Sequence, residues 1–128
     1  MKEITVMLYD TNKEHHTAQG VIYNNDAVIE AFKKFGDLDH PKYVYTEAPD
    51  TCVGDLSQVA GTLKDLSFKE DGVWGNIQLL DTPQGKFAQT LMEQLGNKMH
   101  FVPDGYGRVV GDKVIDYEIT SISIALGE

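Results

Sequence analysis

Residues 60–96 read AGTLKDLSFKEDGVWGNIQLLDTPQGKFAQTLMEQLG and decide the fold class, because strand and helix patterns follow one another in this single stretch. Residues 60–68 alternate loosely between apolar and polar side chains, and residues 73–80 are apolar and compatible with a strand. Between them, KEDG at 69–72 has the composition of a turn. The first half of the stretch is therefore predicted to be a β-hairpin.

A helix is predicted to follow this hairpin directly. Thr82 can cap its first turn, and Pro83 suits the first helical position because an N–H there would have no partner in the helix. Gly96 is expected to end the helix. The stripe predicted to be buried consists of Phe87, Ala88, Leu91, Met92 and Leu95.

A strand and another helix are predicted on the N-terminal side of this stretch. Residues 4–9 are rich in strand-forming residues. Asn25 or Asp26 can cap the helix, and Gly36 fits the position just past its end. The apolar residues that recur between these ends at helical spacing are Val28, Ile29, Phe32 and Phe35.

The remaining segments are predicted to be loops and strands. Residues 36–41 contain too many helix-breaking residues to continue a helix, and residues 43–52 show no sustained period, so we expect an irregular excursion there. The C-terminal part is predicted to contain strands at 99–102, 108–110 and 114–126, with turns at 103–105 and 111–112.

Together these elements predict a single α+β domain over residues 1–128, with a compact, mostly antiparallel and barrel-like sheet and two main helices. A chain of 128 residues that is 41% hydrophobic can bury one core. Cys52 is the one cysteine, so a disulfide within the chain is impossible, and we expect a reducing cytoplasmic environment.

The charge of the chain narrows the classes of partner. Its net charge is −9, and its 11 Lys and Arg residues are scattered, so binding to nucleic acid is not expected. The absence of any apolar stretch of roughly 20 residues predicts a soluble protein without a membrane partner. We expect neither a cofactor nor a metal, because the usual motifs are missing and the adjacent His15 and His16 of a polar loop point apart.

Several polar residues are candidates for chemistry, and each also has an ordinary structural interpretation. His40, between Asp39 and Pro41, could be a general base near a cleft, although a surface histidine is the commoner case. Asp116 and Glu118 share one face of a predicted strand and could orient a histidine or simply be exposed. The candidate nucleophiles, none of them in a sharp glycine-flanked turn, are Ser57, Ser67, Ser121 and Ser123.

The order of five short segments carries a family resemblance. These segments are GVIYNN at 20–25, GDLDHP at 36–41, VAGTLKDL at 59–66, VWGNIQLL at 73–80 and DTPQG at 81–85. In this order they resemble the NGRxY-type segment, the GELDHP signature, the central hairpin and the LxTPxG segment of the prohead maturation protease family of tailed bacteriophages, particularly its T4-like branch. The histidine of GELDHP is catalytic in that family, so the resemblance implies this role for His40.

The chain departs from the family at the nucleophile. The family has a GxSSRGxG-like stretch that carries the nucleophilic serine, whereas residues 100–107 read HFVPDGYG. The last two glycines match, but the two serine positions fall on Val102 and Pro103, and the arginine position falls on Asp104. Neither valine nor proline can attack a carbonyl, and proline also removes a backbone N–H where an oxyanion would need one. The resemblance therefore implies a prohead-protease-like fold without its catalytic serine.

Three functions follow as hypotheses. The leading one is a non-catalytic virion or capsid-assembly protein, as a decoration, cement or minor capsid component or an internal assembly factor. It would bind the phage major capsid or scaffold protein, with self-association as a further option, in the virion or in the host cytoplasm during assembly. The second is an active protease in which Ser121 or Ser123 is a displaced nucleophile working with His40 and with Asp116 or Glu118. The third is a regulator of a paralogous protease.

Overall fold

The computed structural model describes residues 2–13, 15, 22–39, 41–46, 56–111 and 113–126, and for residues 97, 106, 109, 113 and 115 it describes the backbone alone. Its elements in chain order are β1 (Lys2–Asp10), β2 (Ile22–Tyr23), α1 (Asn25–Asp37), β3 (Tyr43–Tyr45), the 3₁₀ turn η1 (Leu56–Gln58), β4 (Val59–Lys69), β5 (Gly72–Leu79), α2 (Pro83–Leu95), the 3₁₀ turn η2 (Gly96–Lys98), β6 (Met99–Val110) and β7 (Lys113–Leu126).

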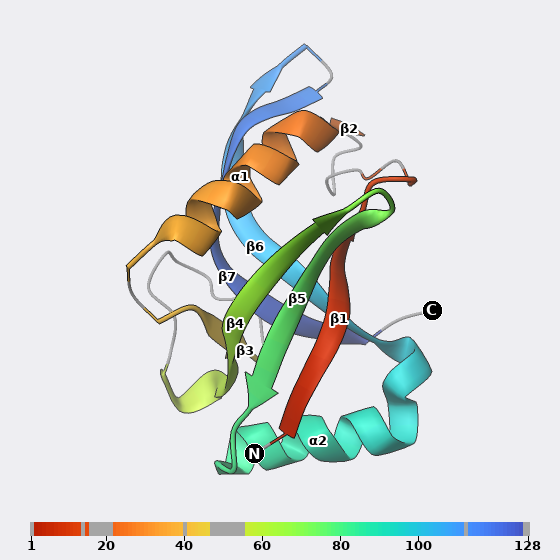
Figure 1. Cartoon of the computed structure of the whole chain (residues 1–128), viewed down its shortest axis with the longest axis vertical. Helices are drawn as coiled ribbons and strands as arrows, with labels where there is room; N and C mark the ends of the chain where they lie inside the picture. The colour runs from red at the N-terminus through yellow and green to blue at the C-terminus, as the bar shows by residue number, and fades with distance from the viewer. Residues whose placement is uncertain are drawn as a thin grey trace.

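The described strands form one curled sheet in the order β1-β5-β4-β3-β7-β2, with β6 paired to β7. Figure 1 shows that the long strands curve across one another, with α1 beside the upper part of the sheet and α2 below its lower end. The fold is α+β, mostly antiparallel and half-barrel-like, with two main helices, and this prediction from the sequence is confirmed.

The hairpin of β4 and β5 forms where the sequence predicts it, and β1 adds to its outer side. β5 pairs antiparallel with both neighbours, so it is an interior strand. Its burial alternates along the strand, with Val73, Ile77 and Leu79 buried. This alternation is typical of a strand that has one face on a core.

The C-terminal hairpin is longer than predicted. The sequence predicts a turn at residues 103–105, and this prediction is wrong, because β6 continues through them and pairs with β7 from Met99 to Val110. The register shifts after Asp104 and after Tyr106, so β-bulges accommodate these residues within one continuous strand, and no turn forms there. The predicted turn after β6 is present at Gly111, whose φ of 65° suits glycine.

Strand β3 corrects a second prediction. Residues 43–52 were expected to be irregular, but Tyr43–Tyr45 pairs antiparallel with β4 and parallel with β7. Val44 is fully buried between these two strands. Three residues are too few to show a periodic pattern, so the pairing partners decide the conformation. β2 is another short strand that pairs parallel with β7.

Both predicted helices are present. Asn24, rather than Asn25 or Asp26, caps α1 by accepting hydrogen bonds from two backbone N–H groups, and the helix continues through Gly36 to Asp37. Thr82 caps α2 as predicted, with its side chain accepting a hydrogen bond from the N–H of Gly85, and the helix ends before Gly96. The first turns of both helices therefore follow local side-chain chemistry, whereas the prediction that Gly36 ends α1 is wrong.

The predicted buried stripe of α2 is only partly right. Ala88 is buried, and Leu91 and Met92 pack against the core while remaining partly exposed. Phe87 and Leu95 are wrongly predicted, since they are 54% and 39% exposed. The helix lies below one end of the sheet (Figure 1), so only a narrow face of it meets the core.

The core fills the inside of the curled sheet beneath α1. Its largest fully buried side chains include Phe32 and Phe35 of α1, Ile77 and Leu79 of β5, and Ile122 of β7. In the described part of the chain, β1 pairs only with β5 and β6 pairs only with β7. The sheet therefore stays open between β1 and β6, and this opening positions the candidate site.

Candidate functional site

A pocket of about 480 Å³ lies in the opening between β1 and β6. It contacts residues 7–10 of β1 and residues 100–103 of β6, which is a consecutive run in each strand. Successive side chains of a strand point to opposite faces, so a cavity on one face would meet alternate residues. The register shift between Met7 and Tyr9 interrupts this alternation in β1, and the pocket is also lined by Val28 of α1 and Tyr117 of β7.

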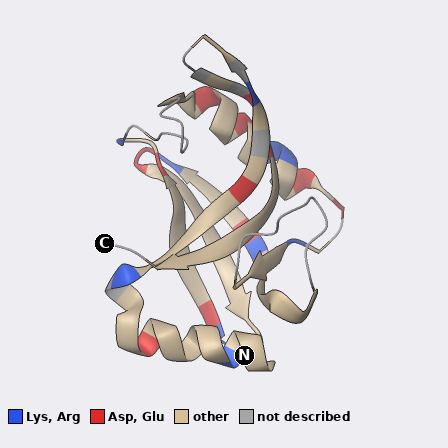
Figure 2. Ribbon diagram, turned by 180° about the vertical axis from the view of Figure 1, so that it is seen from behind, with Lys and Arg blue, Asp and Glu red and all other residues tan. Residues whose placement is uncertain are grey.

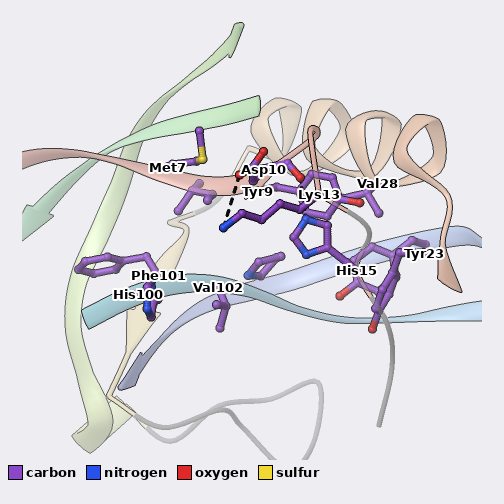
Figure 3. Close-up of a pocket in the computed structure, with 13 residues that line it drawn as sticks. Met7, Tyr9, Asp10, Lys13, His15, Tyr23, Val28, His100, Phe101 and Val102 are labelled. Carbon is purple, nitrogen blue, oxygen red and sulfur yellow. Dashed lines mark hydrogen bonds and ion pairs between the residues drawn. The ribbon is translucent and has the colours of Figure 1, made fainter. Parts of the chain in front are cut away.

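Most of the pocket wall is apolar. One side is formed by Met7 and Leu8 of β1, and the other by Phe101, Val102 and Pro103 of β6. Figure 3 shows Met7 above the opening and Phe101 and Val102 on the strand that crosses below it. Such walls suit an apolar group of a ligand, and the volume falls within the range of pockets that bind small molecules or peptide side chains.

The other end of the pocket is polar and is organised around His15. The His15 ring lies 4.4 Å from the Tyr9 ring, measured between centroids, and its Nε2 lies 2.6 Å from the backbone oxygen of Asp10. Tyr9 donates its hydroxyl proton to Oδ1 of Asn25. Burial, with a smaller contribution from Tyr23, raises the pKa of Tyr9 to about 12, so Tyr9 is a neutral hydrogen-bond donor at physiological pH.

Lys13 brings a positive charge to this end. Its Nζ lies 3.9 Å from Oδ2 of Asp10, which is a long ion pair, and the lysine side chain is 76% exposed. The other oxygen of Asp10 accepts a hydrogen bond of 2.9 Å from the N–H of Asn12. Figure 3 shows the Lys13 side chain extending into the space between β1 and β6. The ammonium group therefore keeps donors available for a ligand.

Tyr23 and Tyr117 complete the polar end. Their rings meet edge to face at 5.4 Å, and Tyr117 is only 9% exposed. Neither hydroxyl forms a hydrogen bond with another residue that the structure describes. Burial is the main cause that raises the pKa of Tyr117 far above the ordinary tyrosine value, so its hydroxyl keeps its proton. The hydroxyl is not among the enclosed unpaired side-chain atoms of the described chain, so it opens onto the pocket, where water or a ligand can accept its proton.

The residues at the family's serine positions lie in this pocket. Val102 and Pro103 both line it, and in the β6–β7 pairing they face Ser123 and Ile122. Neither side chain has a group that could act as a nucleophile. The sequence identified both positions from the resemblance, but it could not show that a pocket lies beside them.

Asp104, at the family's arginine position, forms a polar cluster with the two serines of the alternative protease hypothesis. Ser121 and Ser123 are 4% and 2% exposed, and their hydroxyls donate to the Asp104 carboxylate at 3.2 and 3.0 Å. Burial raises the pKa of Asp104, while the two serine hydroxyls act in the opposite direction. The sequence did not pair these residues, because only the register of β6 and β7 brings them together.

The other predicted site residues are not brought into this cluster. Asp116 and Glu118 are exposed, and Asp116 accepts a hydrogen bond of 2.7 Å from the Arg108 guanidinium. His40 lies outside the described residues, as do His16 and Cys52. The arrangement of His40 with Ser121 or Ser123 therefore stays a prediction.

Charged residues are dispersed over the surface. Figure 2 shows basic and acidic segments spread over helices and strands, without a basic stripe on the face drawn. Within the residues described above, no group of three or more His, Cys, Asp or Glu side chains is placed to hold a metal ion. Neither helix of the described chain has the length and apolar character needed to cross a bilayer.

Comparisons with known proteins add no relative. Models of protein families, curated proteins and solved structures were each searched with this chain, and none of them matches it.

Proposed function

We propose that this chain is a non-catalytic phage virion or capsid-assembly protein with a prohead-protease-like fold, which binds the major capsid or scaffold protein. Val102 and Pro103 carry this proposal. They occupy the positions where the resembled family has its serines, and they line an open pocket. A pocket at this place can hold a polypeptide segment, but these two side chains cannot attack it.

The hydrogen bonds of the nearest serines favour the non-catalytic function. Ser121 and Ser123 are buried, and both donate to Asp104. A serine nucleophile needs a hydroxyl that is open to substrate and is paired with a general base. In this chain the two hydroxyls instead stabilise a half-buried carboxylate. These hydrogen bonds support a structural role for the two serines.

The net charge of −9 is compatible with a position on the capsid exterior. A protein with this charge would be repelled by packaged DNA. We therefore favour decoration, cement or minor capsid protein over a component that lies beside the genome. Such proteins act in the assembled virion and in the host cytoplasm during assembly.

The direct test is to purify virions of the phage that encodes this chain and to quantify it by mass spectrometry against the major capsid protein. A fixed stoichiometric ratio is expected for a virion component. Co-sedimentation of the purified chain with expanded and unexpanded capsids would then identify the binding state. Absence from virions together with no sedimentation with either capsid form would contradict the proposal.

Proteolysis is tested separately. We expect no cleavage when the chain is incubated with capsid and scaffold proteins, and no labelling by a serine-reactive phosphonate. Cleavage that is lost in both His40→Ala and Ser123→Ala, or in His40→Ala and Ser121→Ala, would establish the displaced-nucleophile enzyme instead. Cleavage unaffected by these variants would indicate a contaminating protease.

A further inference from the structure

We infer that α2 carries a self-association surface, on which a second copy of this chain packs its own α2 in antiparallel orientation. The surface is centred on Phe87, Leu91 and Leu95, which follow one another at intervals of four residues and are called the α2 stripe below. This inference concerns contacts between copies, and it does not depend on the capsid partner proposed above. It rests on the exposure of the stripe, on the charges around it and on its symmetric spacing.

The fold leaves the α2 stripe only partly covered. Phe87 is 54% exposed and Leu95 is 39% exposed, while Leu91 between them packs partly against the core. Residues four apart are neighbours on one face of a helix, so the three side chains form a continuous row. Figure 1 shows α2 at the lower end of the molecule, with the sheet on one side of it. Large exposed apolar side chains that adjoin one another among polar residues are typical of an interaction surface.

The residues of α2 beside the stripe are uncharged. The helix has two charged residues, Lys86 and Glu93, and the helical repeat places both on the side opposite to Leu91. The exposed residues next to the stripe are instead Thr90 and Gln94. The Thr90 hydroxyl already donates to the Lys86 carbonyl at 3.0 Å, so a partner can cover it without leaving a donor unpaired.

This lack of charge favours an identical partner. Two copies with a net charge of −9 each repel one another unless their contact keeps the acidic side chains apart. The stripe and its neighbours on α2 satisfy this condition, because they bring no acidic group to the contact. They also offer no charged group that would attract a partner of opposite charge. A contact between two copies is therefore the association that this surface fits best.

The charges at the two ends of α2 favour the antiparallel orientation. Asp81 comes just before the helix, and Lys98 lies at the end of the 3₁₀ turn that follows it. In an antiparallel pair, the Asp81 end of one helix lies beside the Lys98 end of the other, and the two helix dipoles point in opposite directions. A parallel pair would instead place like charges side by side.

The spacing of the stripe is self-complementary in this orientation. With a two-fold axis at Leu91, that residue meets Leu91 of the second copy, and Phe87 of each copy meets Leu95 of the other. A helix of 13 residues is about 20 Å long, so each copy buries less than the roughly 800 Å² of a standard stable complex. We therefore expect a weak dimer, with a Kd of roughly 10–100 µM.

The first test is sedimentation velocity of the whole chain between roughly 5 and 500 µM, over which the wild type should change from monomer to dimer. Phe87→Glu and Leu95→Glu should each weaken the dimer by about tenfold or more, because pairing would bury an unpaired carboxylate. Val110→Glu adds the same charge at the end of β6, where the side chain is also 54% exposed, and it should leave the dimer unchanged. Far-UV circular dichroism checks that every variant is folded.

The second test identifies the orientation by crosslinking. All chains carry Cys52→Ser, so that each introduced cysteine is the only thiol of its chain. Chains with Phe87→Cys are mixed with chains with Leu95→Cys and treated with a short bismaleimide. In the antiparallel pair these two positions meet, so the mixture should crosslink several times faster than either variant alone.

The inference is overturned if the wild-type chain stays monomeric over the whole concentration range. It is also overturned if Val110→Glu weakens the dimer as much as Phe87→Glu and Leu95→Glu do, or if either cysteine variant crosslinks with itself as fast as the mixture does. Loss of the dimer in the two α2 variants alone, together with faster crosslinking of the mixture, supports it. A chain that is found in virions but stays monomeric would retain the proposed function and lose only this inference.

Discussion

The carboxyl group of Asp104 is half-buried between two serine hydroxyls of the neighbouring strand. Burial penalises its charged form, and the hydrogen bonds from Ser121 and Ser123 recover part of this cost. The net effect is a raised pKa, so burial outweighs the hydrogen bonds. This residue stands where the resembled family has an arginine, and its surroundings hold a carboxylate instead of a cation.

Asp104 should make the stability of the chain depend on pH in a defined direction. Because its pKa is raised by folding, the folded chain binds this proton more tightly than the unfolded chain does. The stabilisation is fully present below the ordinary aspartate pKa of about 3.9, and it is lost as pH rises through the raised value. The difference in free energy of unfolding between wild type and Asp104→Asn, measured with urea, should therefore be smaller at about pH 7 than at about pH 4. A larger difference at the higher pH would contradict a raised pKa of Asp104.

Gly85 is required by close packing and not by backbone conformation. A Cβ placed there would lie 2.0 Å from the backbone oxygen of Leu80 and 2.9 Å from that of Ala60. Replacing glycine by alanine within a helix ordinarily stabilises the helix by about 1 kcal/mol. At Gly85 the clash with backbone atoms outweighs this gain. Gly85→Ala should lower the free energy of unfolding by about 3 kcal/mol.

Gly96 provides the matched control for Gly85 at the other end of α2. A Cβ at Gly96 would have nothing within 4 Å, and the backbone conformation there suits alanine. Gly96→Ala should therefore change stability by less than about 1 kcal/mol. Urea unfolding measures both variants. If Gly85→Ala and Gly96→Ala lower the free energy of unfolding equally, the contact with Leu80 is not the reason that glycine is required at position 85.

The first turn of α2 depends on one side chain. Thr82 accepts a hydrogen bond of 3.2 Å from the N–H of Gly85, and this satisfies a donor that has no partner within the helix. Thr82→Ala should lower the free energy of unfolding by about 1 kcal/mol. Thr90→Ala removes a hydroxyl that only donates to the Lys86 carbonyl of its own helix, so that variant should be neutral or slightly stabilising. Thermal unfolding of both variants checks the difference.

Elements with strong local patterns were predicted correctly, and elements that depend on partners were not. The β4–β5 hairpin has its turn chemistry at KEDG, and both helices have caps and apolar periodicity within the segment itself. β3 has only three residues, and within β6 the sequence predicts strands at 99–102 and 108–110 but not their continuation through Pro103 and Gly105. Their pairing with β7 stabilises them, and β7 is remote in sequence from β3.

The whole chain should unfold as one unit if the predicted single domain is correct. Phe32 of α1 is fully buried in a core that also contains residues of β1, β5 and β7. Phe32→Ala should therefore lower the free energy of unfolding by about 3–5 kcal/mol and should affect every element together. Fluorescence of Trp74 reports on β5, whereas far-UV circular dichroism reports on the whole backbone. Coincident midpoints are expected, and separate midpoints would contradict a single domain.

The opening between β1 and β6 is a property of the whole molecule. Its two sides come from opposite ends of the chain, and the curl of the sheet brings them together around the pocket. The sequence places His15 in a polar loop, and in the structure its ring packs on Tyr9 at this opening. No local pattern could have paired these polar residues with Phe101 and Val102.

The sequence by itself determined the α+β class, the β4–β5 hairpin, the positions of both helices and the absence of a hydroxyl at residues 102 and 103. These features depend on side chains a few residues apart, whose hydrogen bonds and periodic burial act within one element. Only the tertiary structure decided that β6 is continuous, that Ser121 and Ser123 bind Asp104, and that β1 and β6 line one pocket. These features depend on register and on the curvature of the sheet, which arise when distant segments pack against one another.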